Sequence, residues 1–156
     1  MDPKKASEYL MNLSKVYRYT LSHLDHETVT LQEELAFLDR YLALLQQRFG
    51  EGIQVRIADE VAKTQGKLPP AALQMLIENA IKHNEHTKER PLIIDVTSDG
   101  QRISVSNKKQ LITTAESTHV GQYNITERYR LLTNEKVLVQ DDAENYCVTI
   151  PIIEAK

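Results

Sequence analysis

The most informative stretch of this sequence is Leu73-Gln74-Met75-Leu76-Ile77-Glu78-Asn79-Ala80-Ile81-Lys82-His83-Asn84. Its apolar residues recur at helical spacing and predict a helix with one buried face, formed by Leu73, Leu76, Ile77, Ala80 and Ile81. A second stripe of the same helix holds Met75, Asn79, Lys82 and His83. An amide, an ammonium and an imidazole on one stripe suit a phosphate-bearing ligand and its metal ion, because the amide oxygen can ligate magnesium and the ammonium can meet phosphate.

Length and composition describe an ordinary globular chain of 156 residues with a formal net charge of −3. Neither a basic run nor repeated aromatic residues occur, so we expect no nucleic-acid partner. No window reaches the roughly 18 apolar residues of a membrane helix, and no signal peptide is evident. Cys147 is the single cysteine, which excludes an internal disulfide. We therefore expect a cytoplasmic location, either as a soluble protein or as the cytoplasmic part of a membrane-bound one.

The first third of the sequence predicts two amphipathic helices. Asp2-Pro3 is a typical helix start, and Thr30-Leu31-Gln32-Glu33 matches the capping box at the start of a second helix. Gly50-Glu51-Gly52 is expected to end that helix. The pattern indicates a helical hairpin or a long broken helix. Its apolar area either packs on the rest of the domain or forms a dimer seam.

From Ile53 onward the hydrophobic period changes to that of alternating strands and helices. Asp99-Gly100 marks a hairpin turn, and residues 61–67 are expected to form a loop. This order predicts the α+β class, with a mixed, mainly antiparallel sheet and helices on one face, preceded by the helical hairpin. We place strands at 53–57, 92–96, 103–106, 137–139 and 146–150, and a further helix at 124–132.

Four segments in order resemble a known family. Residues 68–84 resemble the N-box of sensor histidine kinases of the LytS/YehU type, whose ATP-binding domain has the Bergerat fold. Residues 13–49 look like that family's linker between phosphoacceptor helix and ATPase domain, and residues 117–129 resemble its glycine box. Val148-Thr149-Ile150-Pro151 is similar to its last strand. The resemblance divides the chain into a helical segment, 1–50, from the dimerisation and phosphotransfer region, and a histidine-kinase-like ATP-binding domain, 51–156.

The resemblance implies ATP and Mg²⁺ as cofactors. In this family the N-box asparagine holds magnesium on the nucleotide phosphates, which makes Asn79 the implied metal ligand. Lys82 and His83 would lie along the phosphates or the adenine edge. The alternative for this stripe is an exposed polar helix face with a Glu78–Lys82 pair. The implied ATP-binding residues are Asn79, Lys82, His83, Asn107, Thr118 and Gly121.

The chain departs from the family at its glycine boxes. Asn107-Lys108-Lys109-Gln110 stands where the family usually has Asp-x-Gly-x-Gly, although Asn107 can still accept from the adenine amino group. His119-Val120-Gly121-Gln122 replaces Gly-x-Gly-Leu, and no Gly-Thr is evident in residues 142–145. Glycine-poor segments do not easily fold over a triphosphate as backbone donors. The family's Pro-His-Phe box with the acceptor histidine is also missing, so we do not expect this chain to autophosphorylate alone.

Two functions remain open. The first is the ATP-binding catalytic domain of a two-component sensor histidine kinase, which phosphorylates a histidine outside this chain and passes the signal to a response regulator. In that case we expect a homodimer through the N-terminal helices. The alternative is a degenerate module that no longer binds ATP and acts in dimerisation or regulator binding. The preserved N-box favours the first function, and the missing glycines favour the second.

Overall fold

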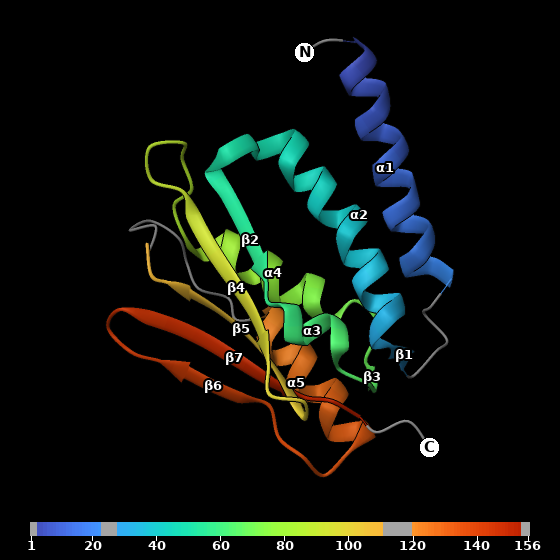
Figure 1. Ribbon diagram of the computed structural model, residues 1–156, viewed down its shortest axis with the longest axis vertical. Helices are drawn as coiled ribbons and strands as arrows, with labels where there is room; N and C mark the ends of the chain where they lie inside the picture. The colour runs from blue at the N-terminus through green and yellow to red at the C-terminus, as the bar shows by residue number, and fades with distance from the viewer. Residues whose placement is uncertain (1–2, 23–27, 111–119, 154–156) are drawn as a thin grey trace.

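A five-stranded sheet with helices against one face forms the body of the protein (Figure 1). The computed structural model describes residues 3–22, 28–110 and 120–153. Its helices are α1 (Pro3–Ser22), α2 (Leu31–Phe49), α3 (Asp59–Lys63), α4 (Ala72–His83) and α5 (Val120–Leu132), with a 3₁₀ turn at Gly50–Gly52. Its strands are β1 (Val29–Thr30), β2 (Ile53–Ile57), β3 (Lys67–Leu68), β4 (Leu92–Ser98), β5 (Arg102–Lys108), β6 (Leu138–Asp141) and β7 (Asn145–Pro151).

The main sheet has the strand order β2-β4-β5-β7-β6. Only β2 and β4 are parallel, and the other neighbours are antiparallel, which confirms the predicted mixed, mainly antiparallel sheet. The β4–β5 turn is the predicted hairpin: Gly100 has a φ of +94°, and Asp99 Oδ1 accepts from the N–H groups of Gln101 and Arg102 at 2.8 and 2.7 Å. These bonds hold the pKa of Asp99 below its ordinary value.

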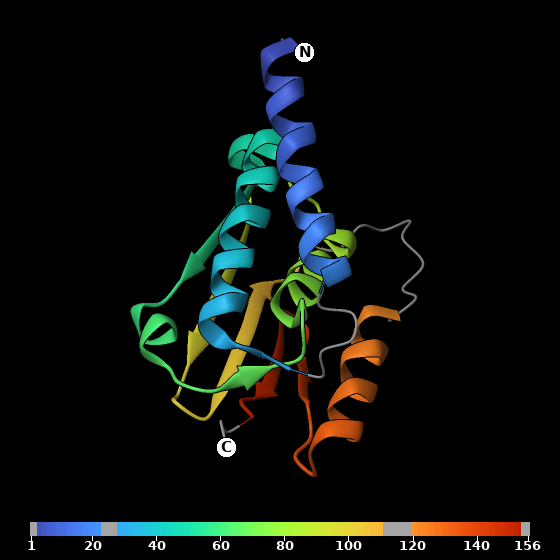
Figure 2. The same ribbon diagram turned by 90° about the vertical axis from the view of Figure 1, so that its right-hand side faces the viewer.

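The core lies between the sheet and the helices. Figure 2 shows that these helices lie against one face of the sheet. Residues that alternate along β4, β5 and β7 point inward and are buried, as a one-sided sheet requires. The N-box helix α4 covers this face, and α2 contributes to the same apolar cluster. The cluster includes Leu31, Leu38, Tyr41, Leu73, Ile77, Ile94, Ile103 and Ile150.

The predicted helical hairpin is present as α1 and α2, which run antiparallel side by side (Figures 1 and 2). Pro3 begins α1, and Thr30 Oγ1 caps α2 by accepting from the Glu33 N–H at 3.2 Å. A small cluster of Val16, Phe37 and Leu44 joins the two helices. In the part of the chain that the structure describes, no helix combines the length and the apolarity needed to cross a membrane.

The loop predicted over residues 61–67 is wrong in part. The short helix α3 covers Asp59–Lys63, and β3 pairs with β1 in a separate two-stranded sheet. Val61 is fully buried and fixes α3 against the core, while the Thr64 hydroxyl donates to the Glu60 carbonyl at 2.7 Å. One buried residue in a polar stretch produces no hydrophobic period, so the sequence pattern does not reveal such short elements.

Candidate functional site

The centre of the site is Asn79 on α4, whose side chain is only 9% exposed. His83, one turn further along, places Nε2 3.1 Å from Asn79 Oδ1, so the ring can donate to the amide oxygen. Lys82 lies on the exposed side of the same helix, and Met75 is half-buried. The three polar residues of the predicted stripe therefore do not act together: the side chains of Asn79 and His83 are in contact, whereas Lys82 faces outward.

The opposite wall of the site comes from the neighbouring strands β5 and β7. Asn107 is 5% exposed and stands directly across from Tyr146 in the antiparallel register. The phenol of Tyr146 is hydrogen-bonded to the Asn79 side chain. Burial, followed by the charge of Asp141, raises the pKa of Tyr146, and the bond from Asn79 opposes this rise. Tyr146 thus connects the N-box helix to the strand pair that carries Asn107.

A hydrogen bond to the backbone of the next residue orients Asn107. Its Nδ2 donates to the Lys108 carbonyl at 2.9 Å, so its Oδ1 is the atom that can accept from a ligand amino group. The neighbouring Lys109 forms an ion pair with Asp141 and donates its backbone N–H to the Glu144 carbonyl at 2.8 Å. Lys109 therefore ties the end of β5 to the β6–β7 hairpin rather than pointing freely to solvent.

A buried asparagine fixes the end of the segment that follows β5. Asn84 is 3% exposed; its Oδ1 accepts from the Gln110 N–H and its Nδ2 donates to the Ala80 carbonyl, both at 2.7 Å. The Gln110 side chain in turn donates to the carbonyls of Glu85 and Pro91 at 3.2 Å. The end of α4 and the segment after β5 are therefore held together, a role that the sequence pattern did not reveal.

Replacing Asn84 by alanine is expected to destabilise the protein by about 1–3 kcal/mol, because it removes both hydrogen bonds of a buried amide and leaves the partly buried Gln110 N–H without its acceptor. Urea denaturation measures this change. The exposed Asn145→Ala is the matched control and should change the free energy of unfolding by no more than about 0.5 kcal/mol. Equal midpoints for the two variants would show that the Asn84 bonds carry no net stability.

Two predicted site residues cannot be placed in this geometry. Thr118 lies outside the described residues. Gly121 is the second residue of α5, but its surroundings also fall outside the part that the structure describes. Their assignment to the nucleotide site stays a prediction.

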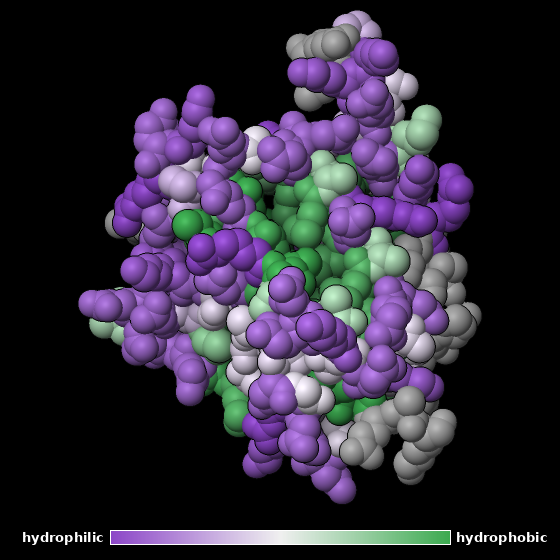
Figure 3. All heavy atoms as spheres, in the orientation of Figure 1, coloured by the Kyte–Doolittle hydropathy of each residue, from purple (hydrophilic) through white to green (hydrophobic). Residues whose placement is uncertain are grey.

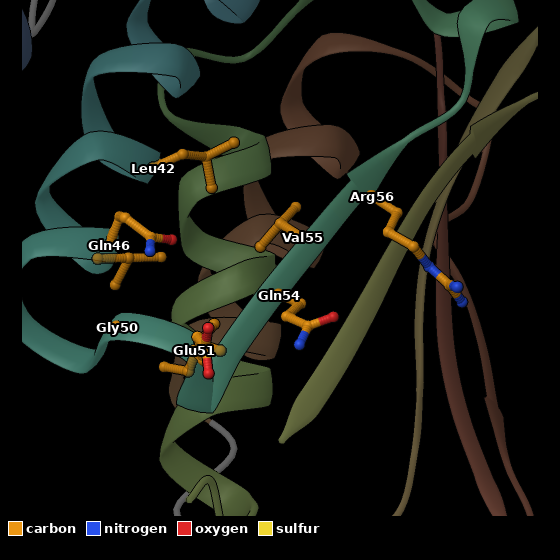
Figure 4. A pocket seen from close by; sticks show the side chains of 9 residues that line it. Leu42, Gln46, Gly50, Glu51, Gln54, Val55 and Arg56 are labelled. Carbon is orange, nitrogen blue, oxygen red and sulfur yellow. The ribbon is translucent and has the colours of Figure 1, made fainter. Parts of the chain in front are cut away.

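A separate hollow opens between α2 and the edge strand β2. Figure 3 shows apolar side chains in its floor, and Figure 4 shows the residues around it. Its volume is about 400 Å³. The lining residues include Leu42, Leu45, Ile53 and Val55 with Gln46, Glu51, Gln54 and Arg56 around them, and none of the predicted site residues.

Comparison with known proteins shows the family of this chain. A family model described as histidine kinase matches residues 1–53. The sensor protein LytS of Enterococcus faecalis is 32% identical over 144 residues, which cover 81% of this chain and 24% of that protein. The LytS of Streptococcus mutans is 32% identical over 131 residues, covering 81% of this chain and 22% of that protein. The chain belongs to the sensor histidine kinase family. It spans about a quarter of the length of these LytS sensors.

Solved structures show the same fold. The cytoplasmic segment of histidine kinase QseC has a TM-score of 0.53 at 16% identity, covering 97% of this chain and 95% of that one. The catalytic domain of histidine kinase ThkA has a TM-score of 0.52 at 12% identity, covering 82% of this chain and 97% of that one. The predicted Bergerat-type architecture is confirmed by this likeness to histidine kinase domains.

Proposed function

We propose that this chain is the ATP-binding catalytic module of a two-component sensor histidine kinase. The observation that supports this most is that Tyr146 of β7 neighbours both Asn79 of α4 and Asn107 of β5. Tyr146 therefore links a candidate metal ligand and a candidate adenine acceptor that lie on two different elements. His83 beside Asn79 adds a ring nitrogen to the same wall.

The donor set fits a magnesium nucleotide. Magnesium usually keeps several waters and takes one or two protein oxygens together with the substrate phosphates, so a single amide oxygen from Asn79 is a sufficient protein ligand. An amide oxygen has two lone pairs, so Asn79 Oδ1 can accept from His83 and still bind the ion. Bound there, the ion would neutralise charge on the phosphates. Lys82, an exposed residue of the same helix, is the candidate phosphate contact.

In the intact protein the module would hold ATP so that a histidine outside this chain attacks the γ-phosphorus. The imidazole nitrogen would gain the phosphoryl group as ADP leaves, and an aspartate of a response regulator would then take it. Phosphoryl transfer needs mainly positioning and charge neutralisation, which Asn79 and Lys82 can supply. We place the homodimer contact on α1, where Leu10 and Met11 are 62% and 59% exposed.

The alternative function, a degenerate module without ATP binding, also has structural support. Asn79 already has two protein partners in the chain itself, His83 and Tyr146. The side chain of Lys109 is engaged with Asp141 where the family has glycine-rich backbone. If these contacts persist in solution, the module would act through dimerisation or regulator binding alone.

A nuclear magnetic resonance titration distinguishes between the ATP-binding module and the degenerate module. A ¹⁵N-labelled sample is titrated with magnesium and a non-hydrolysable ATP analogue. The kinase proposal expects saturable shifts concentrated at residues 79–84 and 107–110. The same titration with magnesium and inorganic triphosphate controls for non-specific anion binding. Spectra that do not change at millimolar analogue would support the degenerate module instead.

A further inference from the structure

A buried carboxylate of α2 caps the N-terminus of the N-box helix. Glu34 is fully buried, although a charged side chain normally stays in water unless it is paired. One carboxylate oxygen accepts from the Ala71 N–H at 3.1 Å, and the other accepts from the Leu73 N–H at 3.2 Å. Both donors belong to the start of α4.

The start of α4 has no side-chain cap of its own. Ala71 precedes the helix with a φ of +62°, a left-handed conformation, and supplies no side-chain acceptor. The first N–H groups of any helix need an acceptor from elsewhere, and the positive end of the helix dipole favours an anion there. Arg128 Nη1 of α5 also donates to the Pro70 carbonyl at 2.7 Å. The entry of the chain into α4 is therefore held by side chains of α2 and α5.

A second polar contact joins the same two helices further along. Tyr41, two helical turns after Glu34 in α2, is hydrogen-bonded to Glu78. Glu78 is the residue directly before Asn79. Burial, together with the Glu78 carboxylate, raises the pKa of Tyr41, so the phenol stays the proton donor in this bond. The helix α2 thus contacts α4 both at its first turn and beside the candidate metal ligand.

We propose that Glu34 is a positioning residue for the nucleotide site: from α2 it fixes the first turn of α4 and thereby the position of Asn79. This inference rests on the proposed function. Because a packed helix moves as a rigid rod, a shift of its first turn also displaces Asn79, about two turns later. Ala71 also packs against the α1–α2 cluster, so a rearrangement of the helical hairpin reaches the same point. Nucleotide affinity therefore depends on the position in which α2 packs against α4.

The test compares Glu34→Gln with Glu33→Gln. Both residues lie in the first turn of α2, so both variants lose the same charge at the same helix end. The affinity for a non-hydrolysable ATP analogue is measured with and without magnesium. The ratio of the affinity with magnesium to the affinity without it measures the contribution of the metal. In Glu34→Gln we expect this ratio to fall about tenfold, because residue 34 loses one hydrogen-bond acceptor and its negative charge. In Glu33→Gln we expect the same ratio as in the wild type. A lower fraction of folded protein would weaken the affinities with and without magnesium equally, and would leave their ratio unchanged.

The side-chain amide signals of Asn79 test the inference without any nucleotide. They should shift in Glu34→Gln and stay in place in Glu33→Gln. If Glu34→Gln does not fold, Tyr41→Phe provides the second variant, with a smaller shift of the same signals and a smaller fall of the affinity ratio. Unchanged Asn79 signals in a folded Glu34→Gln protein overturn the positioning role. A wild-type protein that binds no nucleotide contradicts the proposed function instead, and the amide signals still decide the role of Glu34.

Discussion

Replacing Asn79 by alanine is expected to weaken binding of magnesium and an ATP analogue by at least about 100-fold. Changes to groups that merely orient a metal ligand often cost 10–100-fold in affinity, so loss of the ligand oxygen itself should cost no less. The variant also removes the acceptor that His83 Nε2 faces at 3.1 Å. Calorimetric titration in the presence of magnesium measures the affinity.

The exposed Asn134→Ala is the control for this measurement, because it removes the same amide outside the site. It should bind as the wild type does. Equal affinities of Asn79→Ala and wild type would mean that Asn79 of α4 does not bind the metal ion, even if the nucleotide itself were bound.

Replacing Leu73 by alanine is expected to lower the free energy of unfolding by about 2–5 kcal/mol. Leu73 is fully buried in the first turns of α4, where the helix meets the main core. Deleting its side chain removes buried apolar area and leaves a cavity that the neighbours fill only in part. Urea denaturation followed by circular dichroism gives the change.

Leu131→Ala provides the matched comparison, because Leu131 on α5 is 76% exposed. Its unfolding free energy should stay within about 0.5 kcal/mol of the wild type. A loss in Leu73→Ala no larger than in Leu131→Ala would mean that α4 does not pack on the sheet as described.

Most of the fold could be predicted because its long elements have strong local signals. Thr30 and Glu33 mark the start of α2, and Asp99-Gly100 marks the β4–β5 turn; both act through bonds between near neighbours in sequence. The strand order and the parallel β2–β4 pair have no such signal, because they depend on contacts between distant segments. The family resemblance supplied what the local pattern lacked.

The site could be predicted only in part, since helical spacing gives the direction of a side chain but not its depth. Spacing correctly placed Asn79 and His83 together, yet it could not show that Lys82 faces outward. Tyr146 of β7 contacts Asn79, a contact that the sequence pattern did not predict. A signal was present, because Tyr146 lies two residues before the buried Val148 and therefore faces the same side of the sheet. Glu34 had a visible signal too: it lies between Leu31 and Leu38 on the apolar face of α2.

Calorimetric titration of the wild-type chain with a non-hydrolysable ATP analogue, with and without magnesium, shows directly whether the chain binds a magnesium nucleotide. We expect a single site with micromolar affinity, and this affinity should weaken markedly when magnesium is removed. Absence of binding at millimolar analogue would contradict this expectation and leave the degenerate module as the function of this chain.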